Sequence, residues 1–269
     1  MAFLLPYLLT RISLPYWKPL LKQAVQVNNY RGRQVISLFG LPLAVSLVVT
    51  YIFSPLWGVP PAGAVALVQV VIFLGLTGLI DDYFGKGTDP VQARGFAGHL
   101  GELLQNGRVT SGLLKLLLIS LLGFYLALQQ AVSFQDFLSS LLLVPLAANT
   151  VNLFDLRPLR AIKAFALFSL PLAGGLEVFW QAYLPIPAVL LPYIPIEARE
   201  EGMLGDTGAN LLGGLLGYFY LSLASWPVKA SLSLLLLLIN LSAERISFSC
   251  LICENPLLNY LDSLGREGD

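Results

Sequence analysis

Long uncharged runs alternate with short charged segments along the chain. A helix needs about 20 mainly apolar residues to cross the hydrocarbon core of a bilayer. We expect crossings at 36–57, 61–80, 116–135, 137–154, 164–176, 178–196, 207–226 and 230–243. One more apolar run, 3–21, is interrupted by Arg11 and Lys18. The pattern predicts an all-α, polytopic transmembrane bundle of about nine spans.

Composition points to the same class of protein. Hydrophobic residues make up 56% of the chain and charged residues 12%, whereas soluble proteins carry roughly a quarter charged residues. The spans leave no room for a separate soluble domain, so we expect a single integral membrane domain over 1–269. The formal net charge of zero gives no reason to expect nucleic-acid binding.

The charged residues gather on one side of the predicted membrane. Loops that alternate onto this side hold thirteen of the sixteen lysines and arginines, so the positive-inside rule makes it cytoplasmic. We therefore expect a multi-pass protein of the inner (plasma) membrane. The same side holds fourteen of the sixteen acidic residues, which that rule does not predict. A functional site would explain this concentration, and longer loops on this side are the alternative.

Aspartates stand at the ends of two predicted spans. Asp81 and Asp82 follow the apolar run 61–80, and Mg²⁺ would relieve the repulsion between adjacent carboxylates. Asp206 lies between Gly205 and Gly208, where the backbone can approach an anionic ligand closely. A solvated helix end is the structural alternative for the pair, and a helix cap is the alternative for Asp206.

A third polar segment ends the span 137–154. Asn149 and Asn152 share a helical face, and Asp155 follows them. A ribose, a base or a metal-bound water would satisfy the two amides, and so would hydrogen bonds between helices. Three basic residues suited to phosphate oxygens come next: Arg157, Arg160 and Lys163.

Two further basic stretches are compatible with an anionic head group, although positive-inside residues would look similar. They contribute Arg31 and Arg33, then Arg94, His99 and Lys115. Cys250 and Cys253 lack the partners for a four-ligand zinc site and are interpreted as incidental. In the last segment, Asn255 can cap a short helix that begins at Pro256 and lies on the cytoplasmic surface.

Together these segments resemble the polyprenyl-phosphate N-acetylhexosamine-1-phosphate transferases (glycosyltransferase family 4). This family includes the phospho-N-acetylmuramoyl-pentapeptide transferase and its GlcNAc-1-phosphate relatives. The resemblance covers roughly residues 28–226, in the family's order. It rests on NNYRGR at 28–33, GLIDDYFG at 78–85, GFAGHLGELLQNGRVTSGLLK at 95–115, NTVNLFD at 149–155 and MLGDTGAN at 203–210.

The resemblance implies transfer of a sugar 1-phosphate from a UDP-sugar to polyprenyl (undecaprenyl) phosphate, with Mg²⁺, in cell-envelope glycan biosynthesis. It implies that Asp206 ligates the metal and that Asp81 or Asp82 deprotonates or orients the lipid phosphate. It also implies that Asn152 and Asp155 position the nucleotide and the metal. We leave open whether the chain forms a homodimer.

The chain departs from the family at two places. His99 is the sole histidine, so the family's histidine-rich loop is missing, and SAERISFS stands at 242–249 instead. After Asp155, the usual Gly-x-Asp-Gly is replaced by LRPLR. An alternative is a non-catalytic relative that binds polyprenyl phosphate or envelope-assembly partners. A cation-coupled transporter fits less well, because it predicts charges near the middle of several spans.

Overall fold

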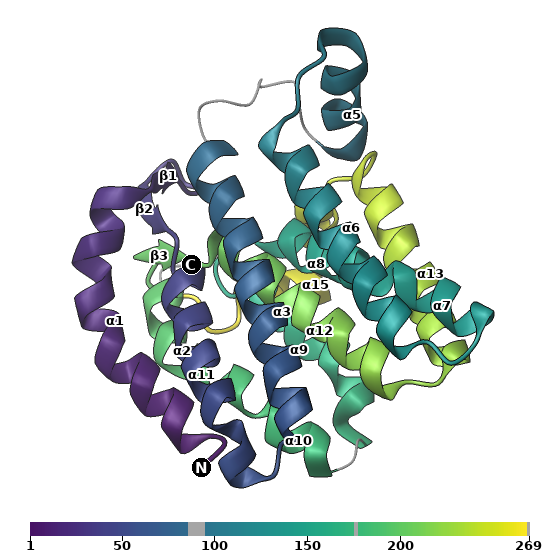
Figure 1. Ribbon diagram of the computed structural model, residues 1–269. Helices are drawn as coiled ribbons and strands as arrows, with labels where there is room; N and C mark the ends of the chain where they lie inside the picture. The colour runs from purple at the N-terminus through teal and green to yellow at the C-terminus, as the bar shows by residue number, and fades with distance from the viewer. Residues whose placement is uncertain (86–94, 175–176, 268–269) are drawn as a thin grey trace.

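The computed structural model describes residues 1–85, 95–174 and 177–267, and helices dominate it (Figure 1). Because apolar runs bury their backbone polar groups best as helices, the long runs of the sequence become helices packed side by side. They are α1 (Leu4–Ala24), α2 (Gly40–Phe53), α3 (Pro61–Ile80), α5 (Gly95–Asn106), α6 (Ser111–Gln130), α7 (Phe134–Leu141), α8 (Leu143–Phe154), α9 (Arg160–Ser169), α10 (Glu177–Tyr183), α11 (Pro185–Ala198), α12 (Gly205–Leu223), α13 (Trp226–Ala243), α14 (Phe248–Glu254) and α15 (Pro256–Ser263).

Six segments of the described chain are long and apolar enough to cross a membrane. They are Gly40–Trp57, Pro61–Gly85, Ser111–Gln130, Phe134–Phe154, Phe179–Ala198 and Trp226–Ala243. Each matches one of the nine expected crossings, so a multi-pass membrane protein is supported. The other three expected crossings correspond to α1, α9 and α12. α1 carries three basic residues, and α9 has only 10 residues.

Helix α12 forms the centre of the bundle and packs against α8, α3 and α2. Every residue from 207 to 221 is buried. Glycines allow this close packing: a Cβ on Gly213 would lie 2.3 Å from the carbonyl oxygen of Ala147 on α8. Because α12 is enclosed by other helices, it does not need the high hydropathy of a lipid-facing span.

The contact between α3 and α12 gives a first prediction. A Cβ on Gly78 would lie 2.4 Å from the Cα of Thr207. Because this Cα is a backbone atom, relieving the clash would require the helix itself to shift. We expect Gly78→Ala to destabilise the protein by about 1–3 kcal/mol, measured as thermal unfolding in detergent. Gly101→Ala on α5 is the matched control, because a Cβ there would have no described atom within 4 Å apart from its own helix backbone and its chain neighbours. Equal melting temperatures for the two variants would contradict this packing.

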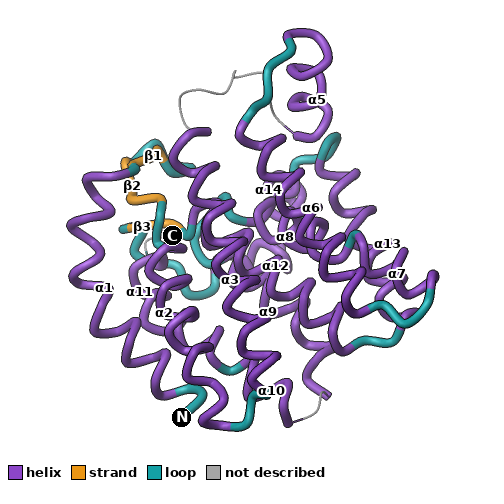
Figure 2. The backbone as a smooth tube through the Cα atoms, in the orientation of Figure 1, coloured by secondary structure: helices purple, strands orange, loops and turns teal. Residues whose placement is uncertain are grey.

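The expectation of an all-α fold needs one correction, because a small sheet lies beside the upper end of α1 (Figure 2). Strand β1 (Gln26–Asn28) pairs antiparallel with β2 (Gln34–Ser37), which pairs parallel with β3 (Gly202–Met203). The register joins Ile36 to Gly202. These strands are too short for hydrophobic periodicity to reveal them. In addition, β2 and β3 pair although they lie far apart in the sequence.

A buried ion pair fixes the other end of the bundle. Lys229 at the start of α13 lies 2.8 Å from Asp136 on α7, and both side chains are 5% exposed. Asp136 also accepts a hydrogen bond from the backbone N–H of Val132. Lys229 is therefore neutralised by a buried partner on α7.

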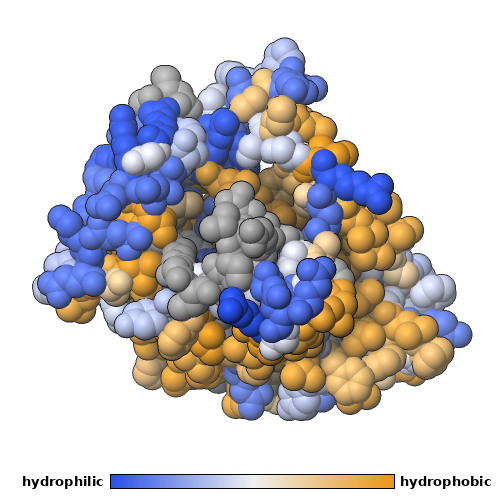
Figure 3. Space-filling model, turned by 90° about the horizontal axis from the view of Figure 1, so that it is seen from above, coloured by the Kyte–Doolittle hydropathy of each residue, from blue (hydrophilic) through white to orange (hydrophobic). Residues whose placement is uncertain are grey.

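The predicted helix near the end of the sequence is present as α15. The side chain of Asn255 accepts hydrogen bonds from the backbone N–H groups of Leu257 and Leu258, and Pro256 occupies the first turn. The cap confirms the predicted start of the helix. Seen from above, hydrophilic residues gather over the left and upper parts of the view, and apolar residues dominate its lower and right parts (Figure 3).

Candidate active site

An acidic cluster with one central lysine forms where α3, α6 and α12 meet. The Lys115 ammonium on α6 lies 2.5 Å from Asp81 Oδ2 and 2.6 Å from Asp206 Oδ1. The Ser111 hydroxyl, one helical turn earlier, donates to Asp81 Oδ1 at 2.5 Å. The lysine side chain is only 13% exposed. Three helices distant in sequence thus bring two carboxylates against one shared cation.

Asp82 serves a different purpose from its neighbour Asp81, because it caps α12 from another helix. Its carboxylate accepts from the backbone N–H groups of Asp206 (3.1 Å) and Thr207 (2.8 Å), and from the Thr207 hydroxyl (2.7 Å). Asp82 is fully buried. The first N–H groups of a helix lack intrahelical partners and carry partial positive charge, so a carboxylate stabilises them.

The local backbone explains how the cap is reached. Asp81–Gly85 forms a π-helical turn that continues α3 and carries both aspartates. Gly205 adopts φ +70°, and a Cβ there would lie 2.8 Å from an oxygen of Asp82. Only glycine tolerates both conditions. The sequence interpretation has the backbone at Gly205 approach an anionic ligand; in the structure the group that comes close to Gly205 is the Asp82 carboxylate of the same chain.

Asp155 lies just beyond α8 and is 9% exposed. Burial, together with the negative charges of Glu197, Asp206 and Asp82, raises the pKa of Asp155 well above its ordinary range. A hydrogen bond from the Gly205 N–H opposes this shift. Within the described residues, Asp155 Oδ1 accepts no hydrogen bond. This oxygen is a polar atom for which a positive ligand would be favourable.

The donor set can be compared with what Mg²⁺ requires. No group of three His, Cys, Asp or Glu side chains within the described ranges could hold a metal ion by itself. Mg²⁺, however, usually binds one or two carboxylates and completes its shell with water and substrate phosphates. Asp206 and Asp155, the two predicted ligands, supply hard oxygen atoms, and Asp155 Oδ1 has no hydrogen-bond partner in the part of the chain that the structure describes. These donor atoms are of the type that Mg²⁺ prefers.

Two of the predicted basic residues gather at the hairpin between β1 and β2, with a third from the loop after α8. Arg31 and Arg33 lie 3.3 Å and 3.9 Å from Glu200, whose side chain is 6% exposed. The guanidinium of Arg157 lies 5.2 Å from the Tyr30 ring centroid. Glu200 also has φ +56°, an unusual conformation for a non-glycine residue. This group connects the hairpin to the segment that follows Asp155.

The remaining predicted residues lie elsewhere. Asn149 donates to the side chain of Asn240 on α13, which also donates to Thr150. The Asn149 amide is therefore satisfied by a hydrogen bond between helices, which is the structural alternative given above. Asn152 is half-buried in the last turn of α8. Arg160 and Lys163 contact Asp262 on α15 and are occupied there by partners within the chain.

His99 belongs to the contact between α5 and α6. Its Nδ1 lies 2.8 Å from the hydroxyl oxygen of Thr110, which also accepts from the Leu113 N–H at the start of α6. The imidazole covers Gly112, where a Cβ would lie 2.4 Å from Nε2. The predicted binding residue Arg94 lies outside the described residues.

Sequence reasoning missed several residues of this region, notably Ser111, Glu197 and Glu200. Glu197 is 1% exposed, and its Oε1 accepts from the backbone N–H of Leu159 at 3.2 Å. One signal for Glu197 was visible: a carboxylate that follows directly on a proline-rich apolar run. Comparison with known proteins finds no protein family that matches the chain and no matching curated protein.

Proposed function

We propose that this protein transfers a sugar 1-phosphate from a UDP-sugar to a polyprenyl phosphate and releases UMP. The observation that carries the proposal is the cluster of Asp81, Lys115 and Asp206, which joins three helices at one end of the bundle. Four of the five motifs that resemble the transferase family contain either a residue of this cluster or a residue that lies beside it. A lipid acceptor and a nucleotide donor explain why such a site lies in an apolar protein.

The reaction needs mainly alignment and neutralisation of charge. An oxygen of the lipid phosphate attacks the phosphorus that bears the sugar, the bond from this phosphorus to the bridging oxygen breaks, and UMP leaves with that oxygen. A phosphate monoester has a second pKa of about 6, so the acceptor is mostly a dianion at neutral pH. A strong base is therefore unnecessary, and holding the anion in line is the main task.

Lys115 and Asp81 would orient the acceptor phosphate, with the ammonium offsetting its negative charge. Asp82 would keep the start of α12 in place through the contacts to Asp206 and Thr207. Asp206 and Asp155 would hold Mg²⁺, which supplies Lewis acidity and charge neutralisation when it is bound. The arginines near Glu200, which are Arg31, Arg33 and Arg157, would face the nucleotide side of the donor.

The charge distribution of the sequence supports a cytoplasmic orientation of this site in a plasma membrane, where UDP-sugars are available. The pathway would then be the assembly of a cell-envelope glycan. Because the histidine-rich loop is absent, the donor would be held by other groups. Arg157 is the best candidate, since its guanidinium lies on the Tyr30 ring beside a small recess lined by Leu156 and Met203.

The test is release of UMP by the detergent-purified protein with undecaprenyl phosphate, Mg²⁺ and a panel of UDP-sugars. We expect release that requires the lipid, and a loss of about 10²–10³-fold in Asp206→Ala, as for removal of a charge-stabilising group. Glu102→Gln is the matched control, because this exposed α5 carboxylate accepts a hydrogen bond from Asn106, one helical turn away. It should retain wild-type turnover.

Failure would have a specific form. If no UDP-sugar supports turnover while the folded protein still binds radiolabelled polyprenyl phosphate, the chain is a non-catalytic binder of that lipid. Turnover that is unaffected by Asp206→Ala would instead place the chemistry away from the acidic cluster.

A further inference from the structure

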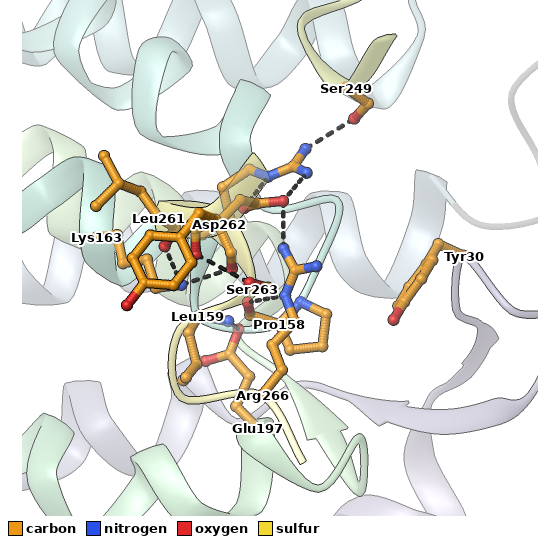
Figure 4. A network of polar contacts seen from close by, with 12 residues as sticks. Tyr30, Pro158, Leu159, Lys163, Glu197, Ser249, Leu261, Asp262, Ser263 and Arg266 are labelled. Carbon is orange, nitrogen blue, oxygen red and sulfur yellow. Dashed lines mark hydrogen bonds and ion pairs between the residues drawn. The ribbon is translucent and has the colours of Figure 1, made fainter. Parts of the chain in front are cut away.

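Four charged residues tie α15 to the segment that follows Asp155. They are Arg160, Lys163, Asp262 and Arg266, and we call them the clamp. Arg160 donates to both oxygens of Asp262, from Nε at 2.8 Å and from Nη2 at 2.6 Å. Arg266 Nη2 lies 2.5 Å from Asp262 Oδ2, so two guanidinium groups share one carboxylate. Figure 4 shows Asp262 at the centre of this network.

The clamp extends beyond its central carboxylate. Lys163 donates to the backbone oxygens of Leu261 (2.9 Å) and Asp262 (2.6 Å), which stand at the end of α15. A lysine here complements the negative end of the helix dipole. Arg160 Nη1 also donates to the Ser249 hydroxyl on α14 at 2.8 Å. The clamp therefore fixes both short helices against the start of α9.

The central ion pair is fully protected from solvent. The side chains of Arg160 and Asp262 are each 4% exposed. Burial alone would raise the pKa of Asp262, but hydrogen bonds from Arg160 and Arg266 lower it below its ordinary value. The carboxylate is therefore ionised at neutral pH, and the bidentate pair is of the strong, geometrically specific kind.

The segment held by the clamp is conformationally unusual. Leu159 has φ +64° although it is not glycine. Its N–H donates to Glu197, and the preceding carbonyl of Pro158 accepts from Arg266 Nε at 3.4 Å. The next residue is Arg160 of the clamp. A strained backbone persists only where surrounding contacts determine it, and here Glu197 and the clamp residue Arg266 supply those contacts.

The apolar side chains of α15 do not account for its position. Leu257 is 66% exposed, Leu258 36% and Leu261 47%. In contrast, Asp262 on the same helix points into the protein and is 5% exposed. The helix is thus held to the protein by its charge and not by packing of its leucines, which remain available for the membrane surface.

We propose that Asp262 is a positioning residue of the candidate active site, and that it acts through Arg160 on the segment carrying Asp155. Asp155 and the clamp residue Arg160 are separated by four residues, which include the strained Leu159. The role in turnover rests on the proposed function, whereas the role in ordering this segment does not. No substrate contact by Asp262 is implied.

The first experiment measures amide hydrogen exchange and does not depend on any enzymatic activity of the protein. Amide hydrogen exchange is measured on the wild-type protein and on Asp262→Asn, each folded in detergent. We expect exchange at Leu159 and Arg160 to accelerate about tenfold or more, as follows from loss of a charge-assisted contact. Exchange within α3 and α12 should be unchanged. Ser249→Ala removes one neutral hydrogen-bond partner of Arg160 and should show a smaller acceleration of exchange. This variant replaces Asp262→Asn in the experiment if Asp262→Asn does not fold.

The second arm is kinetic. In Asp262→Asn we expect the KM for the UDP-sugar to rise about tenfold with a smaller change in kcat, because a displaced segment weakens donor binding. Asp262→Glu, which keeps the charge, should restore part of the affinity. Glu267→Gln is the matched control, since its ion pair with Arg199 is exposed and lies in the same tail. It should leave both constants unchanged.

The outcomes separate the two proposals. Unchanged exchange at Leu159 and Arg160 in a folded Asp262→Asn protein overturns the positioning role. Increased turnover in that variant also overturns it, because Asp262 would then be an internal competitor for an anionic substrate at Arg160. If the wild-type protein has no activity but exchange accelerates as expected, the positioning role stands and the transferase proposal fails.

Discussion

Replacing Lys115 by methionine is expected to reduce UMP release strongly and to destabilise the protein. The ammonium is shared by Asp81 and Asp206, and methionine would leave two poorly solvated carboxylates facing each other without a cation. Breaking a buried pair by removing one partner typically costs about 3–5 kcal/mol. Under the proposed function the acceptor phosphate would also lose its neutralising charge, so we expect turnover to fall at least about 10²-fold.

Lys115→Arg is the informative companion, because it keeps the charge but changes its shape. A guanidinium is planar and forked, so it cannot occupy the compact site between Asp81 and Asp206 in the same way. We expect its melting temperature to be near that of the wild type, with turnover still reduced. Both variants are measured by UMP release and by thermal unfolding in detergent. A Lys115→Met protein with wild-type turnover would rule out the proposed role of the cluster.

Asp82→Asn is the second change with a large expected effect. The carboxylate only accepts hydrogen bonds, and it takes them from three donors at the start of α12. An amide of the same shape has only one oxygen, and its NH₂ group would face backbone N–H groups. The unsatisfied donors should cost about 1–3 kcal/mol. The start of α12 would then shift and carry Asp206 with it.

The measurement for Asp82→Asn is a comparison with Asp81→Asn. The Asp81 carboxylate accepts from a hydroxyl and an ammonium on side chains, which can reorient more easily than a helix backbone. We expect faster amide exchange at Asp206 and Thr207 only in Asp82→Asn, whereas both variants should lose turnover. Equal exchange in the two proteins would show that Asp82 does not hold the helix end.

The sequence predicts well those features that depend on neighbouring residues. The long apolar runs predict the six candidate spans, and Asn255 with Pro256 predicts the start of α15. The aspartates at span ends also indicate that Asp81 and Asp206 belong to one face. These predictions rest on the spacing of apolar residues and on helix-capping residues, and both can be identified from a single sequence.

Contacts between distant segments could not be predicted in this way. Lys115 was expected to bind substrate, but nothing in its surroundings in the sequence indicates that it lies between Asp81 and Asp206. Arg160 was expected to bind phosphate, and its actual partner Asp262 is 102 positions away. A carboxylate and a phosphate satisfy a guanidinium equally well, so the residue type alone cannot distinguish an internal partner from a ligand.

The clamp also has a consequence for the order of events during biosynthesis. Domains form as the polypeptide emerges, at about 5–20 residues per second, with earlier segments folding first. Arg160 therefore leaves the ribosome well before Asp262 and Arg266, and until they arrive its charge lacks the carboxylate that neutralises it. The helices can insert one after another, but the segment after Asp155 acquires its final geometry only when α15 docks. The segment that carries Asp155 is thus completed only after α15 has been made, long after the residues of the segment themselves.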